Sequence, residues 1–265
     1  MSSIALALPL SAIVLLLLIR RDAWPRFAVE AFPGPARRGI AIGLLIAVLG
    51  LVSFAPLIAF DPSQARDDFG EVRFATLFLG HALLAAFLLV WWLLVGRPPL
   101  SQYLALRREP GRFLADLRLG AAGGALAWAV TMTVMVLVGT AVGSVDSAAL
   151  PPSGQDQIPH VVRWIVDLSV GERLALICSA AVVEESFFRS FLQSRCGILI
   201  SSLLFAASHA TYGLTLMLVG VFTVSLVLGW MFRARANVLP CMVAHGVFDA
   251  VQLFVILPAV VGRMA

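Results

Sequence analysis

The hydrophobic residues of this chain gather into about eight long runs and are not spread at the spacing of amphipathic helices or half-buried strands. A helix needs about 20 residues to cross the hydrocarbon core of a bilayer, and most of the runs approach that length. The pattern therefore predicts an all-α, polytopic transmembrane helix bundle. Its spans are expected near residues 3–19, 39–60, 74–96, 119–143, 172–194, 197–212, 214–232 and 238–261.

The arginines between these runs predict an orientation. All 19 basic residues are Arg, and most lie in segments 20–38 and 97–118 or directly after the fifth and seventh runs, whereas segment 144–160 has none. Because basic residues concentrate on the cytoplasmic side, both termini are expected outside. Arg20 and Arg21 follow the first run, which favours a retained anchor over a signal peptide. We expect one integral membrane domain over residues 1–265, in the bacterial inner membrane.

Composition excludes several other classes of protein. Hydrophobic residues make up 60% of the chain and charged residues 13%, about half the charged share of a soluble domain. The net charge of +4 comes without an Arg cluster interleaved with aromatics, so no nucleic-acid partner is expected. Cys178, Cys196 and Cys241 are widely spaced and form no CxxC pair, which argues against a zinc knuckle or a disulfide framework.

Ionisable residues inside the predicted spans are the main functional signal. Each costs several kcal/mol in hydrocarbon unless it is paired or lines a polar cavity. Nearly all of them fall in the fifth, sixth and eighth spans, and they are Glu184, Glu185, Arg189, His209, His245 and Asp249. Their confinement to three spans predicts a polar site built from those helices.

Spacing separates the roles of these residues. Glu185 and Arg189 are four apart, so they share a helix face and are expected to form a structural ion pair. Glu184 is turned by about 100° from Glu185 and points elsewhere. His245 and Asp249 are also four apart. The carboxylate is expected either to fix the imidazole tautomer or to face a reacting group together with it.

Depth brings three of these residues together. At ~1.5 Å per residue, Glu184, His209 and His245 lie roughly 12–18 Å from the same flank of the bundle. A carboxylate beside two imidazoles is suited to activating water and stabilising an oxyanion. A polar network that only positions helices is the plainer alternative. The same three residues could also bind zinc, but HExxH is absent, and we favour a mechanism without metal or cofactor.

Two features of the N-terminal half are expected to serve packing. His81 is alone in its span and has no carboxylate at helical spacing, so a packing role or an inter-helix hydrogen bond is favoured over catalysis. Gly120 and Gly124 have the small-xxx-small spacing of closely packed helices.

Three ordered motifs resemble those of one enzyme family. Glu184-Glu185-Ser186-Phe187-Phe188-Arg189 matches EExxxR, Phe205-Ala206-Ala207-Ser208-His209 resembles FxxxH, and His245-Gly246-Val247-Phe248-Asp249 resembles HxxxN or HxxxD. The chain is thus similar to the CPBP family of intramembrane proteases, which includes CAAX prenyl endopeptidases, bacteriocin-processing enzymes and Abi-like proteins. The resemblance covers about residues 172–255, the expected catalytic core.

The resemblance implies an endopeptidase that cleaves a membrane-anchored peptide or protein, with or without a lipid group, inside or at the edge of the bilayer. Glu184 would activate water with help from His209, and His245 and Asp249 would stabilise the tetrahedral intermediate. Glu185 and Arg189 would support these catalytic side chains without taking part in the reaction themselves. Some members have Asn where this chain has Asp249, and an ionised Asp cannot donate to an oxyanion.

Two other functions stay open. One is a non-catalytic scaffold or immunity protein of the same fold. The other is a proton-coupled transporter, since buried Glu and His also build proton relays. A transporter predicts interrupted helices in two related halves, and no such repeat is present in the sequence.

Overall fold

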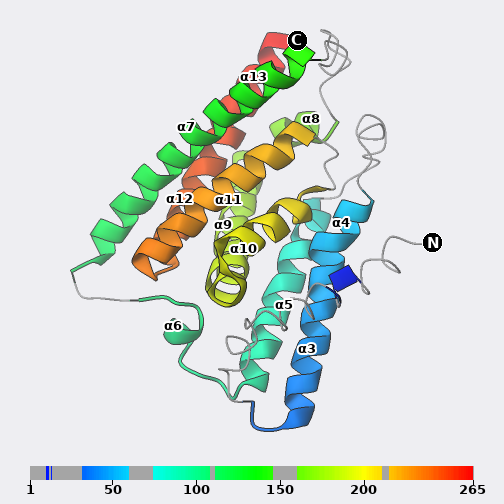
Figure 1. Ribbon diagram of the computed structural model, residues 1–265. Helices are drawn as coiled ribbons and strands as arrows, with labels where there is room; N and C mark the ends of the chain where they lie inside the picture. The colour runs from blue at the N-terminus through cyan, green and yellow to red at the C-terminus, as the bar shows by residue number, and fades with distance from the viewer. Residues whose placement is uncertain are drawn as a thin grey trace.

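The computed structural model describes most of the chain and is drawn in Figure 1. The described residues are 10, 11, 13, 32–59, 74–107, 111–145, 160–210 and 215–264. Regular secondary structure in these ranges is entirely helical, which confirms the predicted all-α class. The first predicted span, near 3–19, lies almost wholly outside the described residues.

The helices follow one another in this order. The N-terminal half contains α3 (Pro35–Leu49), the π-helical turn η2 (Gly50–Phe54), α4 (Ala55–Ile58), the 3-10 turn η3 (Phe74–Leu77), α5 (Phe78–Leu94), α6 (Leu100–Tyr103) and α7 (Phe113–Val145). The C-terminal half contains α8 (His160–Asp167), α9 (Val170–Glu184), the π-helical segment η5 (Glu185–Gln193), α10 (Ser194–Ser208), α11 (Thr215–Arg235), α12 (Leu239–Val251), the π-helical turn η7 (Gln252–Ile256) and α13 (Leu257–Met264).

Five helical stretches in the described residues are long and apolar enough to cross a membrane. They are Pro35–Ile58, Phe113–Ala141, Val170–Ser208, Leu216–Arg235 and Leu239–Ala259, and the apolar helix Phe78–Leu94 is somewhat shorter. These stretches cover the second to eighth predicted spans. The prediction of a polytopic helix bundle is therefore confirmed.

The fifth and sixth predicted spans belong to one helical stretch that breaks at Gly197. Its φ of 81° and ψ of 172° lie in a region that is essentially restricted to glycine. Beyond this break, α10 continues only to Ser208, a rise of roughly 16 Å. The sixth segment is therefore about half as long as the hydrocarbon core is thick, and it ends next to His209.

Two apolar clusters hold the described helices together. The first joins α3, η2, α5, η5 and α10, and its aromatic centre includes Phe87, Trp91 and Phe191, whose ring centroids lie 4.8–5.5 Å apart. The second joins α7, α11 and α12 around Ala127 and Leu228. Segment η5 belongs to the first cluster and α12 to the second, so polar residues on these two elements meet between the clusters.

Helices α7 and α12 pack side by side (Figure 1) at a very short distance. A Cβ atom at Gly120 would lie 2.8 Å from the Pro240 carbonyl oxygen, and one at Gly124 would lie 2.5 Å from that of Ala244. The close packing predicted from the small-xxx-small spacing is confirmed. It places α12, with His245, directly against the N-terminal half.

A buried polar cluster closes one end of the bundle. Asp116 at the start of α7 accepts hydrogen bonds from Arg235 at 2.6 Å and from the Asn237 side chain at 2.9 Å. These contacts bring segment 97–118 and the segment after α11 to the same end, as the arginine distribution predicts.

Candidate active site

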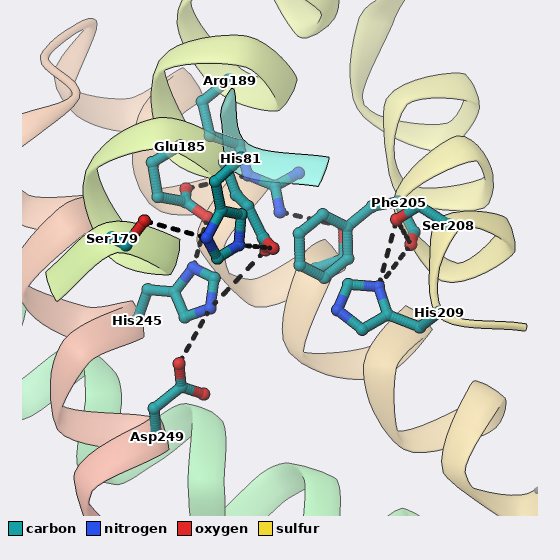
Figure 2. A network of polar contacts seen from close by, with 11 residues as sticks. His81, Ser179, Glu185, Arg189, Phe205, Ser208, His209, His245 and Asp249 are labelled. Atoms are coloured by element: carbon teal, nitrogen blue, oxygen red, sulfur yellow. Dashed lines mark hydrogen bonds and ion pairs between the residues drawn. The ribbon is translucent and has the colours of Figure 1, made fainter. Parts of the chain in front are cut away.

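Most of the ionisable residues predicted to form a polar site lie in one connected network at the meeting point of α5, α9, η5 and α12 (Figure 2). It contains five of the six residues singled out from the sequence, namely Glu184, Glu185, Arg189, His245 and Asp249, together with His81 and Ser179.

Glu184 is the last residue of the regular helix α9, and its two oxygens have different surroundings. Oε1 lies 3.0 Å from Nε2 of His81. Oε2 is buried, has no hydrogen-bond partner among the described residues, and lies 4.0 Å from Nε2 of His245. One oxygen is thus held by a neighbouring helix, and the other retains its lone pairs for a further ligand.

Glu185 begins the π-helical segment η5 and is completely buried. Its Oε2 accepts a hydrogen bond from Nε of Arg189 at 3.1 Å, so the ion pair predicted from the i, i+4 spacing is present. Its Oε1 lies 2.9 Å from Nδ1 of His245. Arg189 also donates to Ser225 of α11 at 3.0 Å. Glu185 therefore has both oxygens occupied, in contrast to Glu184.

His245 on α12 receives its orientation from Glu185. Because the Glu185 carboxylate only accepts, Nδ1 of His245 carries a proton in this contact. Nε2 then faces Oδ2 of Asp249 at 3.4 Å and Oε2 of Glu184 at 4.0 Å. Two roles were left open for Asp249 from the sequence, namely to fix the tautomer of His245 or to face a reacting group together with it. Glu185 occupies Nδ1, and Asp249 lies beside Nε2, the nitrogen nearer to Glu184.

His209 follows the end of α10 and joins the cluster through an aromatic ring. Its Nδ1 lies 2.9 Å from the Phe205 carbonyl oxygen and 3.1 Å from the Ser208 hydroxyl. The Phe205 ring is 4.8 Å from the His209 ring and 6.0 Å from the His245 ring, centroid to centroid. His209 and His245 therefore both lie against the ring of Phe205. A shared site of these two imidazoles with Glu184 stays a prediction.

His81 and Ser179 also belong to the network, which the sequence did not predict. His81 forms the inter-helix hydrogen bond that was favoured for it, but its partner is Glu184, the principal candidate base. Its other ring nitrogen lies 2.9 Å from the Ser179 hydroxyl. One signal in the sequence could have indicated a role for His81. Placing an imidazole inside a membrane span costs free energy, so such a residue is a candidate for function by default.

An apolar pocket lies between some of the same helices, although none of the side chains of the network lines it. It has a volume of about 280 Å³ between α5, α6 and the α9–η5 junction, with Leu88, Trp92, Tyr103, Val183 and Ser186 in its wall. Tyr103 donates its hydroxyl to the Leu88 carbonyl at 2.8 Å. Burial raises the pKa of Tyr103 above its usual value, so the phenol keeps the proton that this bond requires.

A metal site needs several ligating side chains arranged around one point. Within the described ranges, no group of three or more His, Cys, Asp or Glu side chains is arranged to hold a metal ion. Nδ1 of His245 is directed to Glu185 and Nδ1 of His209 to a backbone carbonyl. Glu184, His209 and His245, the alternative zinc ligands, do not form such a group in the part of the chain that the structure describes.

Comparison with known proteins agrees with the motifs. Residues 168–251 match the family model of type II CAAX prenyl endopeptidase Rce1-like proteins. Over 84 residues the chain is 36% identical to the uncharacterized protein YpbD of Bacillus subtilis (strain 168), a match that covers 31% of this chain and 44% of YpbD. The chain thus spans less than half the length of that relative, and no solved structure matches it. The resemblance to the CAAX protease family is confirmed for residues 168–251, the segment that carries Glu184, His209 and His245.

Proposed function

We propose that this protein is an intramembrane endopeptidase that hydrolyses a peptide bond of a membrane-associated peptide or protein with water activated by Glu184. The main support for this proposal is the environment of Oε2 of Glu184. This oxygen is buried, has no hydrogen-bond partner among the described residues and faces His245. A carboxylate oxygen in this position is suited to receive a proton from water.

The reaction follows from this placement. Oε2 of Glu184 takes a proton from water while the water oxygen attacks the carbonyl carbon of the scissile bond, and the carbonyl electron pair moves onto oxygen. When the tetrahedral intermediate collapses, the carbon–nitrogen bond breaks and Glu184 returns the proton to the leaving amine. The products are a new carboxyl terminus and a new amino terminus, and Glu184 is again a carboxylate.

The imidazoles supply positive charge and donors for the oxyanion. When the His245 ring carries both protons, Nδ1–H is held by Glu185 and Nε2–H lies on the side of Oε2 of Glu184, 4.0 Å away, where the attacked carbonyl would sit. Asp249 orients this ring through its contact with Nε2 and does not itself donate while it is ionised. His209, whose Nδ1 is turned to the Phe205 carbonyl, contributes its Nε2 side to the water or the oxyanion.

The substrate class follows from the surroundings of the network. The pocket between α5, α6 and the α9–η5 junction has an apolar wall, in which Leu89 and Val182 are exposed on the outer face of the bundle. A chain that enters from the bilayer can place an apolar side chain or lipid group there. This supports a membrane-anchored substrate, and lipidated and unlipidated forms are compared in the test.

The test is peptide release by purified protein from a panel of membrane-anchored peptides, each with and without a prenyl group. Glu184→Gln keeps the size of the side chain but removes the base, and we expect kcat to fall by at least about 10²-fold. Folding of the variant is checked by thermal unfolding in the same detergent. Full activity in a folded Glu184→Gln protein would exclude Glu184 as the base.

Chelator separates the two hydrolytic mechanisms. Cleavage that persists in chelator and is lost in Glu184→Gln supports water activation by the carboxylate alone. Cleavage that chelator abolishes and added zinc restores would replace this mechanism with a metal-dependent one. If the wild-type protein cleaves none of the panel, the proposed function fails and the scaffold and transporter hypotheses gain support.

A further inference from the structure

Helix α5 brings one ionisable side chain into the network from outside the segment that matches the protease family. His81 lies 87 residues before residue 168, where the match begins, and none of the three motifs includes it. Its ring is mostly buried, with 12% of the side chain exposed, and each ring nitrogen has a polar partner on α9 (Figure 2).

The two partners determine how the ring is protonated. The Glu184 carboxylate can only accept, so Nε2 of His81 donates to Oε1 across 3.0 Å. In the neutral ring, Nδ1 is then an acceptor and takes a hydrogen bond from the Ser179 hydroxyl at 2.9 Å. A hydroxyl supplies either a donor or an acceptor, so Ser179 satisfies this tautomer without a second charge.

The ring is also held sterically. Phe78, one helical turn earlier on α5, packs edge-on against the imidazole with 6.1 Å between ring centroids. The hydrogen bond to Glu184 thus comes from a donor fixed by its own helix and by Ser179. A fixed donor on Oε1 restricts rotation of the carboxylate and leaves Oε2 facing His245.

We propose that His81 is a positioning residue of the active site, which holds Oε1 of Glu184 so that Oε2 is presented to the attacking water. This inference rests on the proposed hydrolytic function of Glu184. Its consequence is that residues 168–251 are not a sufficient catalytic unit, because a donor from the N-terminal half completes the base.

Three substitutions at one position test the donor. In His81→Gln the side-chain amide nitrogen lies near the place of Nε2 and can still donate to Glu184. In His81→Asn the shorter amide reaches only the place of Nδ1, and His81→Leu has no donor. We expect kcat to fall about 10- to 100-fold in His81→Leu and His81→Asn, with little change in KM, as for other partners that orient a reacting group. His81→Gln should recover most of kcat.

A purely structural link between α5 and α9 predicts a different result. Activity of the three variants would then follow their thermal stability, and Asn and Gln would behave alike. A folded His81→Leu or His81→Asn protein with wild-type kcat would overturn the positioning role. If His81→Leu does not fold, the comparison of the two amides still decides the question.

Nitrogen NMR of the imidazoles provides a readout that does not depend on cleavage. The chain has four His residues, so ¹⁵N-histidine labelling gives few signals, and those of His81 are the ones missing in His81→Gln. We expect hydrogen on Nε2 and an Nε2 shift that changes in Glu184→Gln but not in Asp116→Asn, a control at the far polar cluster.

The two readouts separate the possible failures. If the wild-type protein cleaves nothing while Nε2 of His81 responds to Glu184→Gln, the contact is real and the proposed hydrolytic function is wrong, together with the role of His81 in it. If the wild-type protein cleaves and neither kcat nor the NMR signal connects His81 with Glu184, only the positioning role is overturned.

Discussion

At the scale of single residues, the two consecutive glutamates differ in how their oxygens are used. Glu185 contacts Arg189 and His245, so both of its oxygens are occupied. Of the two oxygens of Glu184, only Oε1 has a hydrogen-bond partner among the described residues, and that partner is His81. A fully paired buried carboxylate stabilises its neighbours, whereas a half-paired one is available for chemistry. This difference supports the assignment of Glu184 as base and Glu185 as support.

The Glu185–Arg189 pair gives a prediction about stability. Arg189→Met should lower the free energy of unfolding by about 3–5 kcal/mol, because it leaves a fully buried carboxylate without its cation. The double variant Glu185→Gln/Arg189→Met should lose less than Arg189→Met alone, since no unpaired charge remains. Chemical and thermal unfolding in detergent measure both.

Arg118→Met serves as the matched control for this pair. Arg118 is exposed at the start of α7, and its replacement should change stability by less than about 0.5 kcal/mol. A double variant that is less stable than Arg189→Met would contradict the explanation through an unpaired buried charge.

At the scale of helical elements, irregular geometry shapes the site. The π-helical segment η5 starts at Glu185, directly after Glu184 ends α9. A π-helix inserts an extra residue into the turn and is frequent at functional sites. Here the two glutamates fall on either side of the change in geometry. The 3.6-residue spacing predicted the Glu185–Arg189 pair, but it could not predict this change, because π-helical turns have no strong sequence signal.

Gly197 gives a prediction at this scale. Its backbone conformation is strained for any residue with a Cβ, although nothing lies within 4 Å of a Cβ placed there. Gly197→Ala should therefore destabilise the protein by about 1–3 kcal/mol through the backbone alone. Thermal unfolding measures the loss, and peptidase activity should fall as α10, with His209, changes direction.

Gly43→Ala is the control for this prediction. Gly43 lies inside helix α3, is exposed and also has open space at the Cβ position. Because alanine is the better helix former, this replacement should be neutral or stabilise by up to about 1 kcal/mol. Equal stability of the two variants would show that Gly197 does not need its left-handed conformation.

At the scale of the whole molecule, the N-terminal half positions and completes the site of the C-terminal half. Helix α5 contributes His81, and α7 lies against α12, which carries His245. The contact between α7 and α12 is close because Gly120 and Gly124 have no side chains. The N-terminal half carries none of the three motifs, but its helix α7 helps to determine where the motif residue His245 lies.

Gly124 gives the prediction at this scale. A Cβ atom there would lie 2.5 Å from the Ala244 carbonyl oxygen and 2.7 Å from Cβ of Val247, on either side of His245. Gly124→Ala should therefore move α12, destabilise the bundle by about 1–3 kcal/mol and lower kcat. Unfolding and peptide release measure these effects.

The matched replacement on the same helix is Gly139→Ala. The nearest atom to its Cβ would be 3.8 Å away, an ordinary contact, so stability and kcat should stay close to wild type. Wild-type kcat in Gly124→Ala would mean that the α7–α12 contact does not set the position of His245.

The sequence by itself determined the membrane-spanning helical class, the ion pair of Glu185 with Arg189 and the motif residues, because each depends on composition or on spacing within one helix. Three contacts were decided only by the tertiary structure. Glu185 contacts Nδ1 of His245, His81 contacts Glu184, and Ser179 contacts the other ring nitrogen of His81. These contacts join residues that are 60–103 positions apart in the sequence. They depend on helix rotation and crossing, which the spacing of polar residues along a single helix does not specify.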